Sequence, residues 1–256
     1  SPYSVFELNQ MLNDGIKFTI ATERTPASLM SELGDLHLKL PVIAMDGAVL
    51  YDLNEKRYLA CNRLSKEMTQ RICDLLRKKE LHYFLNVVLQ DVLLIYYHEF
   101  RNEEEQKLYE RARSSPYRNY VYGDVPEEGI PVYFLLVVKK EDADAAQQEI
   151  QQLEGAEELL FLRDTSETPE GYCHLKIYHK NATKEYMVRR LLENVTGMGN
   201  RKVVAFGSNK NDVSLMQWAD LSYATAEASA DVKAAADYQL RGKGGDSIVR
   251  TILHLY

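Results

Sequence analysis

A run of apolar residues that ends in a polar turn is the feature of this chain best suited to chemistry. Residues 203–206 read Val-Val-Ala-Phe, and Gly207 and Ser208 then open a polar stretch that ends in Asn211 and Asp212. This pattern predicts a buried strand that delivers polar groups to the open end of a sheet, where α/β proteins bind ligands. The amide and carboxylate oxygens of Asn211 and Asp212 suit hydrated Mg²⁺ and its ligands. An Asx turn that caps the next helix is the alternative interpretation of these two residues.

A second polar turn follows the apolar residues 17–22. The run Lys-Phe-Thr-Ile-Ala-Thr predicts a short buried strand that ends at Thr22, and Glu23 and Arg24 follow directly. The Thr22 hydroxyl suits a phosphoryl oxygen, and the Arg24 guanidinium is able to hold an anionic substrate through two hydrogen bonds. A threonine that caps a helix or stabilises a turn, and a solvated surface arginine, are the alternatives that remain open.

Lys184 stands at the start of a predicted helix for which Thr183 is the expected cap. Because the helix dipole disfavours a cation at a helix N-terminus, this position points to an anionic partner. One more exposed lysine among the 31 basic residues is the alternative. Asp46 and Gly47 form a further polar turn, after the apolar residues 40–44.

The two ends of the chain alternate short strands with helices, which predicts parallel strands joined by right-handed crossovers. Residues 50–175 differ, because their strands are longer, richer in aromatic residues and more often adjacent. We therefore expect an α/β fold in which residues 1–49 and 176–256 build a parallel-sheet core and residues 50–175 form an inserted α+β cap domain. Since parallel strands end at one edge of a sheet, the polar turns at residues 22–24, 46–47 and 207–212 should lie together.

Composition and charge exclude several classes of protein. The net charge of −7 argues against a nucleic-acid-binding protein, which normally has a basic face. No apolar stretch is long enough to cross a bilayer, and no signal peptide opens the chain. The three scattered cysteines form no CxxC pair, which is typical of a reduced protein. We expect a cytoplasmic protein that binds neither nucleic acid nor membranes. HExxH, GxSxG, Walker and GxGxxG motifs are absent from the sequence.

Four segments, taken in order, resemble the haloacid dehalogenase (HAD) superfamily. They are residues 20–26 (Ile-Ala-Thr-Glu-Arg-Thr-Pro), residues 45–48 (Met-Asp-Gly-Ala), Lys184, and residues 206–212 (Phe-Gly-Ser-Asn-Lys-Asn-Asp). They are similar to the ATGR-like second motif, the NGA-like turn at the cap entrance, the motif-three lysine and the GDxxND fourth motif of the Cof-type branch with a type IIB cap. The resemblance spans nearly the whole chain.

The resemblance implies a Rossmannoid core and an Mg²⁺-dependent phosphatase in which an aspartate of a DxDGT motif attacks phosphorus to give an aspartyl-phosphate. The substrate would be a small phosphorylated metabolite such as a sugar phosphate, selected by the cap. By position, the resemblance implies catalytic roles for Thr22, Lys184 and Asp212, substrate binding by Thr22, Glu23, Arg24, Asp46, Gly47, Lys184 and Asn211, and metal binding by Ser208 and Asp212.

The sequence departs from the family pattern in four places. It contains no DxDGT motif. Ser208 replaces the metal-binding aspartate of GDxxND, while Glu23 replaces a glycine and Asp46 an asparagine. Without the strand that ends in the first motif, the neighbouring strands would have unpaired buried backbone groups, at about 1–3 kcal/mol per group. We therefore expect an N-terminally shortened version of a slightly longer natural protein.

Two classes of function follow from this pattern. The first is a HAD-type phosphatase, favoured by the retained Thr22, Arg24, Lys184, Asn211 and Asp212. The second is a catalytically inactive homologue that binds a phosphorylated ligand or a protein partner, favoured by Ser208 and the absent nucleophile. An unrelated α/β binding module would need the ordered motif match to be a coincidence, and it is the least favoured.

Overall fold

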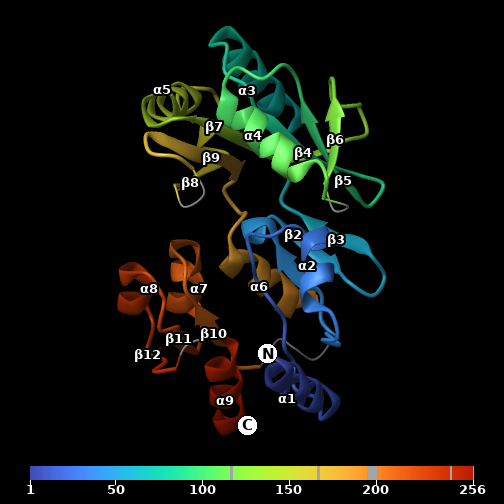
Figure 1. Ribbon diagram of the computed structural model, residues 1–256, viewed down its shortest axis with the longest axis vertical. Coiled ribbons are helices and arrows are strands. Elements are labelled where there is room, and N and C mark those ends of the chain that lie inside the picture. Colours follow the sequence, from blue (N-terminus) through green and yellow to red (C-terminus); the bar gives the residue numbers. More distant parts are fainter. Residues whose placement is uncertain (116–117, 166–167, 195–200, 243, 256) are drawn as a thin grey trace. The chain divides into compact units, whose positions relative to one another are not determined.

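The computed structural model describes residues 1–115, 118–165, 168–194, 201–242 and 244–255 of the chain (Figure 1). By packing, the chain divides into two compact units. The core unit consists of Ser1–Ala60 and Thr183–Tyr256, and the inserted unit of Cys61–Ala182. No helix among the described residues has both the length and the apolar character that a membrane span requires.

The first part of the core unit has helices that begin where the sequence supplies caps. The Thr25 hydroxyl accepts the N–H of Ser28, and Pro26 occupies the first turn of its helix. The elements of this part are α1 (Pro2–Asn13), α2 (Pro26–Leu33), β1 (Val42–Ala44), the 3₁₀ turn η1 (Met45–Gly47), β2 (Val49–Asp52) and β3 (Arg57–Cys61). Strands β2 and β3 are neighbours, and a turn at residues 53–56 joins them as a hairpin around Asn54.

The second part of the core unit alternates strands and helices as predicted. Its elements are α6 (Lys184–Asn194), β10 (Val204–Gly207), η3 (Lys210–Asp212), α7 (Val213–Trp218), β11 (Leu221–Ala224), α8 (Ala230–Ala235), β12 (Tyr238–Gln239) and α9 (Gly245–Leu255). Strands β10, β11 and β12 pair in parallel. Ala205 and Ala224 pack with the apolar faces of α6, α7 and α8 in one hydrophobic cluster.

The core unit contains two three-stranded sheets, β1-β2-β3 and β10-β11-β12, and together their strands are mixed in direction, so the prediction of a parallel sheet holds only in part. Strands β10, β11 and β12 are parallel, whereas β1 and β2 are antiparallel, with Ile43 opposite Leu50. The predicted strand at residues 17–22 contributes one parallel bridge, between Ala21 and Ile43. The reason for the antiparallel pair is the tight turn η1, which reverses the chain directly after β1.

The inserted unit is an α+β structure, as the pattern of residues 50–175 predicts. Its elements are α3 (Lys66–Lys78), β4 (Phe84–Leu89), β5 (Val92–Tyr97), α4 (Glu103–Ala112), β6 (Asn119–Tyr122), β7 (Ile130–Lys139), α5 (Lys140–Ile150), η2 (Ala156–Glu158), β8 (Leu159–Asp164) and β9 (Tyr172–His179). The strands form one sheet in the order β6-β5-β4-β7-β9-β8. The unit spans Cys61–Ala182 and not the expected 50–175, because β2 pairs with β1, β3 lies next to β2, and strand β9 continues to His179.

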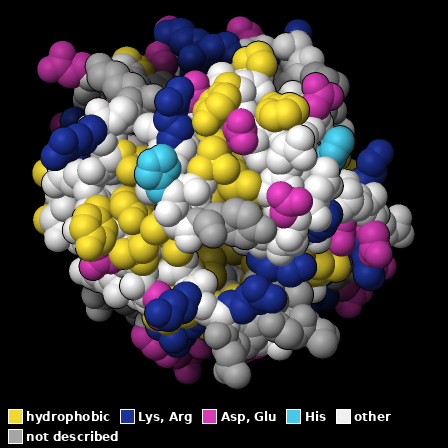
Figure 2. Space-filling view, turned by 90° about the horizontal axis from the view of Figure 1, so that it is seen from below, with side chains coloured by type: hydrophobic (Ala, Val, Ile, Leu, Met, Phe, Trp, Pro, Cys, Tyr) yellow, Lys and Arg dark blue, Asp and Glu magenta, His cyan; other side chains and the backbone are white. Residues whose placement is uncertain are grey.

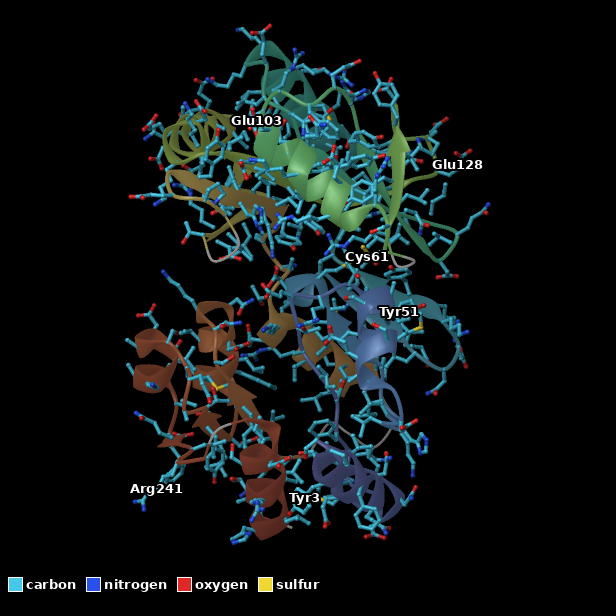
Figure 3. All side chains as sticks on the ribbon, viewed as in Figure 1. Tyr3, Tyr51, Cys61, Glu103, Glu128 and Arg241 are labelled. Carbon is cyan, nitrogen blue, oxygen red and sulfur yellow. The ribbon has the colours of Figure 1, made fainter. Side chains whose placement is uncertain are left out.

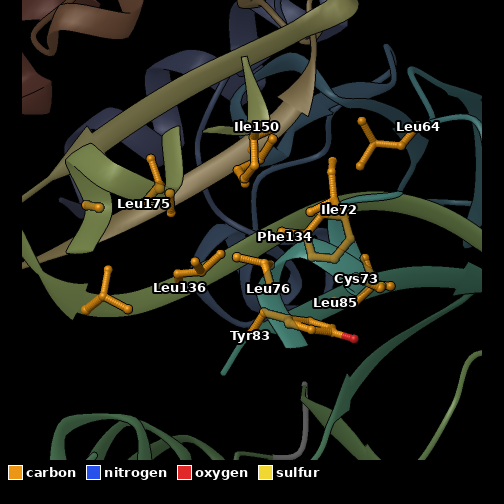
Figure 4. Packing of buried hydrophobic residues seen from close by; sticks show 14 of the residues in the cluster. Leu64, Ile72, Cys73, Leu76, Tyr83, Leu85, Phe134, Leu136, Ile150 and Leu175 are labelled. Carbon is orange, nitrogen blue, oxygen red and sulfur yellow. The ribbon is translucent and has the colours of Figure 1, made fainter. Parts of the chain in front are cut away.

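Alternating residues of this sheet pack against helices on its two faces. Phe134 and Leu136 of β7 pack in the main core with Ile72 and Leu76 of α3 and with residues of α5 (Figure 4). Val137, which directly follows Leu136, packs in a second cluster, which includes residues of α4.

A buried histidine and a buried glutamate lie together in the inserted unit. His82 is 4% and Glu105 1% exposed, and their Nδ1 and Oε2 atoms are 3.6 Å apart. Burial lowers the pKa of His82 to about 4, with smaller contributions from the nearby His98 and Arg101. Burial also raises the pKa of Glu105 above its usual range.

The stability of the protein should therefore fall between pH 7 and pH 5. The folded state keeps His82 neutral down to about pH 4, whereas the unfolded chain takes up this proton below about pH 6.5. The free energy of unfolding should be lower by about 2 kcal/mol at pH 5. Part of this loss is offset, because the raised pKa of Glu105 lets the folded state take up a proton at a higher pH than the unfolded chain does. Urea unfolding at both pH values measures it, and His82→Phe should flatten the pH dependence. An equal loss in both proteins would contradict this assignment.

Gly47 allows η1 to lie directly against the start of α6. It has φ +95°, and a Cβ atom on it would lie 2.2 Å from the carbonyl carbon of Thr183 and 2.6 Å from the nitrogen of Lys184. Any other residue would therefore force the turn away from α6. The turn and the helix carry Asp46 and Lys184 respectively, so this contact positions two of the predicted site residues.

Gly47→Ala should destabilise the core unit by about 3 kcal/mol or more, the sum of a left-handed backbone and an overpacked contact. Gly15→Ala is the matched control, because Gly15 has φ +101° and open space where a Cβ would be. The control should cost only the backbone term, about 1–2 kcal/mol. Equal losses for the two variants in urea unfolding would show that the close contact is unimportant.

Candidate functional site

A buried ion pair lies at the centre of the site. The Lys184 Nζ is 2.5 Å from Asp212 Oδ1, and the two residues are 4% and 6% exposed. Lys184 Nζ also lies 3.4 Å from Asn211 Oδ1. The pair joins the first turn of α6 to the turn after β10. Buried charges of this kind are costly unless paired and hydrogen-bonded, so the two residues depend on each other.

The second carboxylate oxygen of Asp212 shapes the turn that follows β10. Its Oδ2 accepts the backbone N–H groups of Ser208, at 2.8 Å, and of Asn209, at 2.9 Å. Gly207 makes this turn possible, because a Cβ on it would lie 2.8 Å from the Asp212 Cβ. Asp212 thus takes part in the capping box of η3, whereas its side chain makes no cap hydrogen bond to the next helix, α7, as the alternative interpretation required.

Asp46 joins the site through Asn211. The Asn211 Nδ2 donates to Asp46 Oδ1 at 2.5 Å, and Asp46 is 2% exposed. Asp46 has φ +59°, and the preceding Met45 has φ +52°. Left-handed backbone of this kind costs about 1–3 kcal/mol per non-glycine residue and is common at functional sites. Two adjacent residues in this conformation indicate that the surrounding structure imposes the turn.

Thr22 lies next to this turn, whereas Arg24 is paired elsewhere. The N–H of Asp46 donates to the Thr22 carbonyl at 3.1 Å. The Thr22 hydroxyl accepts the N–H of Arg24 at 3.2 Å, so its own proton is available to a ligand. The Arg24 guanidinium pairs with Glu32, and both side chains are about half exposed, at 52% and 48%. Glu23 is also exposed.

The structure thus joins five of the predicted site residues in one group. Hydrogen bonds and the ion pair connect Thr22, Asp46, Lys184, Asn211 and Asp212, and Gly47 and Ser208 contribute backbone that holds them. The Arg24 side chain pairs with Glu32 outside this group, and Glu23 is exposed.

These residues do not offer Mg²⁺ a complete set of ligands. Within the described residues, no group of three or more histidine, cysteine, aspartate or glutamate side chains is placed to hold a metal ion. Both oxygens of Asp212 already accept hydrogen bonds, one of them from a lysine ammonium. Ser208 supplies a neutral hydroxyl where a hard cation prefers a carboxylate. The site as described fits an anion better than a divalent cation.

Lys184 has the capacity to bind such an anion. An ammonium group has three N–H donors, and Asp212 and Asn211 accept only two of them. A low-polarity environment strengthens the attraction between a buried cation and an incoming anion. The third donor of Lys184 and the Thr22 hydroxyl are therefore suited to the oxygens of a phosphoryl group.

Sequence reasoning missed the left-handed turn and the contact between Asp46 and Asn211. The Asp-Gly pair at residues 46–47 did indicate a turn, but nothing in the pattern signals φ > 0 at Met45. The contact joins residues 165 positions apart, so no local pattern contains it. By contrast, the predicted cap of α6 is confirmed, because Thr183 Oγ1 accepts the N–H of Tyr186 at 3.2 Å.

Comparisons with known proteins agree with the predicted family. A model of the haloacid dehalogenase-like hydrolases matches residues 1–252. A Haemophilus influenzae protein named "Putative phosphatase" is 24% identical over an aligned length of 245 residues, and the match covers 93% of this chain and 84% of that protein.

Solved structures show the same fold at low sequence identity. A haloacid dehalogenase-like hydrolase from Bacteroides thetaiotaomicron is 19% identical with a TM-score of 0.76, and the match covers 100% of this chain and 92% of the other. A HAD subclass IIB sugar phosphatase is 20% identical with a TM-score of 0.73, and the match covers 100% of this chain and 91% of the other. Because the family model matches nearly its whole length, the chain belongs to the haloacid dehalogenase-like hydrolase family.

Proposed function

We propose that this protein is a phosphatase that hydrolyses a small phosphorylated metabolite. The observation that carries the proposal is the buried Lys184 ammonium, which is 4% exposed and holds a donor beyond those accepted by Asp212 and Asn211. A preorganised cation in a dry site stabilises the charge of a phosphoryl group more strongly than a solvated cation does.

The other side chains of the group have separate roles in this proposal. The Thr22 hydroxyl donates its proton to a phosphoryl oxygen, because such an oxygen is an acceptor, while the hydroxyl oxygen accepts the Arg24 N–H. Asp212 holds the Lys184 ammonium in place, and Asn211 ties that ammonium to Asp46. Gly47 keeps the turn close to Lys184. These residues would bind and orient the phosphoryl group.

The reaction proposed is attack of an aspartate carboxylate on phosphorus, in which the ester P–O bond breaks and the alcohol leaves. Water then attacks the aspartyl-phosphate, which releases phosphate and restores the carboxylate. Asp212 is paired with Lys184, and Asp46 accepts from Asn211, so both buried carboxylates of the described site are already engaged. We therefore assign the nucleophile to neither of them. Mg²⁺ is the cofactor typical of the family, but Ser208 removes one anionic ligand.

Sugar phosphates are the substrate class we propose. Support comes from the similarity in fold to a HAD subclass IIB sugar phosphatase, at 20% identity. Selection among substrates is assigned to the inserted unit, as the resemblance implies.

A homologue that binds a phosphorylated ligand without turnover is the second candidate. Ser208 is the observation that favours it, because a serine hydroxyl binds a hard divalent cation much less well than a carboxylate does. The two candidates share the same anion site and differ in whether the bound ester is cleaved.

Lys184→Ala should abolish recognition of the phosphoryl group. We expect a loss of at least about 100-fold in kcat/KM, as for removal of one preorganised charged donor. The measurement is phosphate release from a panel of sugar phosphates, with binding of inorganic phosphate measured by calorimetry. Phosphate binding without any turnover in the unaltered protein would favour the second candidate.

Two control variants separate this effect from misfolding. Lys210→Ala removes an exposed lysine next to Asn211 and should leave both measurements unchanged. Since Lys184→Ala leaves the Asp212 carboxylate buried and unpaired, Lys184→Ala with Asp212→Asn removes both charges and relieves that cost. Phosphate binding retained in a folded double variant would refute the role of Lys184.

Ser208→Asp should raise the affinity for Mg²⁺ by about tenfold or more. Even residues that only hydrogen-bond to a metal ligand change metal affinity by about 10–100-fold, so a new carboxylate ligand should have at least the smaller of these effects. The change adds a carboxylate beside Asp212, whose Oδ2 accepts the Ser208 N–H at 2.8 Å. Titration calorimetry with Mg²⁺ measures it, and Ser208→Asn is the neutral control of matched size. Equal affinities in the two variants would show that the turn is not placed to bind a metal.

A further inference from the structure

A polar pocket lies in the inserted unit, where strands β5 and β6 end. It has a volume of about 380 Å³, which is in the range of sites for small molecules. The last turn of α3, the connection from α3 to β4 and the residues that follow β5 and β6 form its walls. None of these residues takes part in the candidate functional site.

Glu80 and Arg101 line this pocket with opposite charges that do not pair with each other. Neither side chain forms an ion pair or a hydrogen bond with any residue that the structure describes. Glu103, which Figure 3 labels at the start of α4, lies two residues after Arg101 but pairs with Lys107. The pocket therefore offers one cation and one anion that the described chain does not neutralise.

The other charged side chains of the pocket already have partners. Arg77 Nη2 is 2.9 Å from Asp124 Oδ1, and His98 Nε2 is 3.4 Å from the same oxygen. Glu99 accepts the Tyr122 hydroxyl. A ligand that binds the two unpaired charges therefore needs to break none of these contacts.

Glu80 has a backbone conformation that a glycine would adopt with less strain. The N–H of Leu81 donates to the Leu76 carbonyl at 2.9 Å, and the N–H of Glu80 donates to the Arg77 carbonyl at 3.0 Å. This is the Schellman pattern, in which the residue at the position of Glu80 is usually glycine. Glu80 has φ +55°, which is unfavourable for a residue with a Cβ atom. A carboxylate at this position, in the wall of a pocket, points to a role for the side chain.

A buried histidine without hydrogen-bond partners also lines the pocket. The His82 side chain is 2% exposed, and neither ring nitrogen has a partner among the described residues. The ring packs edge-to-face against Phe84 and Phe100, with centroid distances of 4.7 and 5.2 Å. Because buried polar groups are almost always hydrogen-bonded, an exception of this kind requires an explanation. A polar ligand would supply the missing partner.

Unpaired charges alone do not make a site, because most charged side chains of a protein are solvated at its surface. Figure 2 shows side chains of both signs spread over the surface of the molecule seen from below. This pocket differs because two unpaired opposite charges line one cavity together with a buried, unpartnered histidine.

We propose that this pocket binds a small zwitterion of the amino acid class. The ligand carboxylate pairs with the Arg101 guanidinium, whose planar donors match a carboxylate through two hydrogen bonds. The ligand ammonium pairs with the Glu80 carboxylate. A neutral imidazole has one donor and one acceptor, so His82 is able to bind a polar atom of either kind. A ligand with one charge would leave either Arg101 or Glu80 unpaired.

Titration calorimetry of the full chain with the proteinogenic amino acids tests this proposal, with acetate and ethylamine as probes that carry a single charge. We expect at least one amino acid to bind with a Kd of about 1 mM or lower, and both single-charge probes to bind at least about tenfold more weakly. Acetate binding as tight as that of every amino acid would reveal a simple anion site and overturn the proposal. The absence of binding by any amino acid would also overturn it.

Glu80→Gly separates ligand recognition from folding. It removes the carboxylate, but glycine suits the left-handed position, so Tm should rise by about 2 °C. The affinity for the amino acid should nevertheless fall at least about tenfold, as it should in Arg101→Ala, because each variant loses one charged partner. Unchanged affinity in either variant would contradict the proposed binding mode.

Two further variants are the controls. Lys78→Ala changes an exposed residue next to the pocket that does not line it, and it should leave the affinity for the amino acid unchanged. Lys184→Ala should also retain this affinity, because Lys184 does not line the pocket. The readout is binding of an amino acid, so the result does not depend on whether the protein hydrolyses phosphate esters.

Discussion

The buried ion pair between Lys184 and Asp212 is the interaction on which the rest of the site depends. It fixes the start of α6 against the turn after β10. Among the described residues, neither side chain forms a second ion pair. Asp212 simultaneously accepts two backbone N–H groups, so the same carboxylate sets the conformation of its own turn. The Asp212 side chain therefore fixes both the backbone of the turn after β10 and the position of the Lys184 ammonium.

The turn at Met45–Gly47 is the second constraint, and it acts through backbone shape. Two left-handed non-glycine residues and a glycine in contact with Thr183 bring Asp46 to the Asn211 amide. Backbone strain of this kind persists only where the surrounding structure determines it. The turn also explains the antiparallel pairing of β1 and β2, since the chain reverses within three residues after β1.

Charge balance in the site connects structure to function. Two carboxylates and one ammonium are buried together, and the oxygens of Asp212 are already used in hydrogen bonds. In the function we propose, Lys184 attracts the phosphoryl oxygens. Ser208 brings no charge to the turn after β10, where the family pattern has a metal-binding aspartate.

The sequence by itself determined the family, most helices and strands, and the types of residue at the strand ends. Those features are local, because caps such as Thr183, the hairpin around Asn54 and the apolar runs need only neighbouring residues. The short strand β6 was missed, because its pairing with β5 joins segments about 25 residues apart. Only the tertiary structure decided that Asp212 pairs with Lys184, that Asn211 binds Asp46 and that Arg24 pairs with Glu32 instead. Which polar groups meet depends on backbone turns and on burial, and neither is encoded in the spacing of residues along the chain.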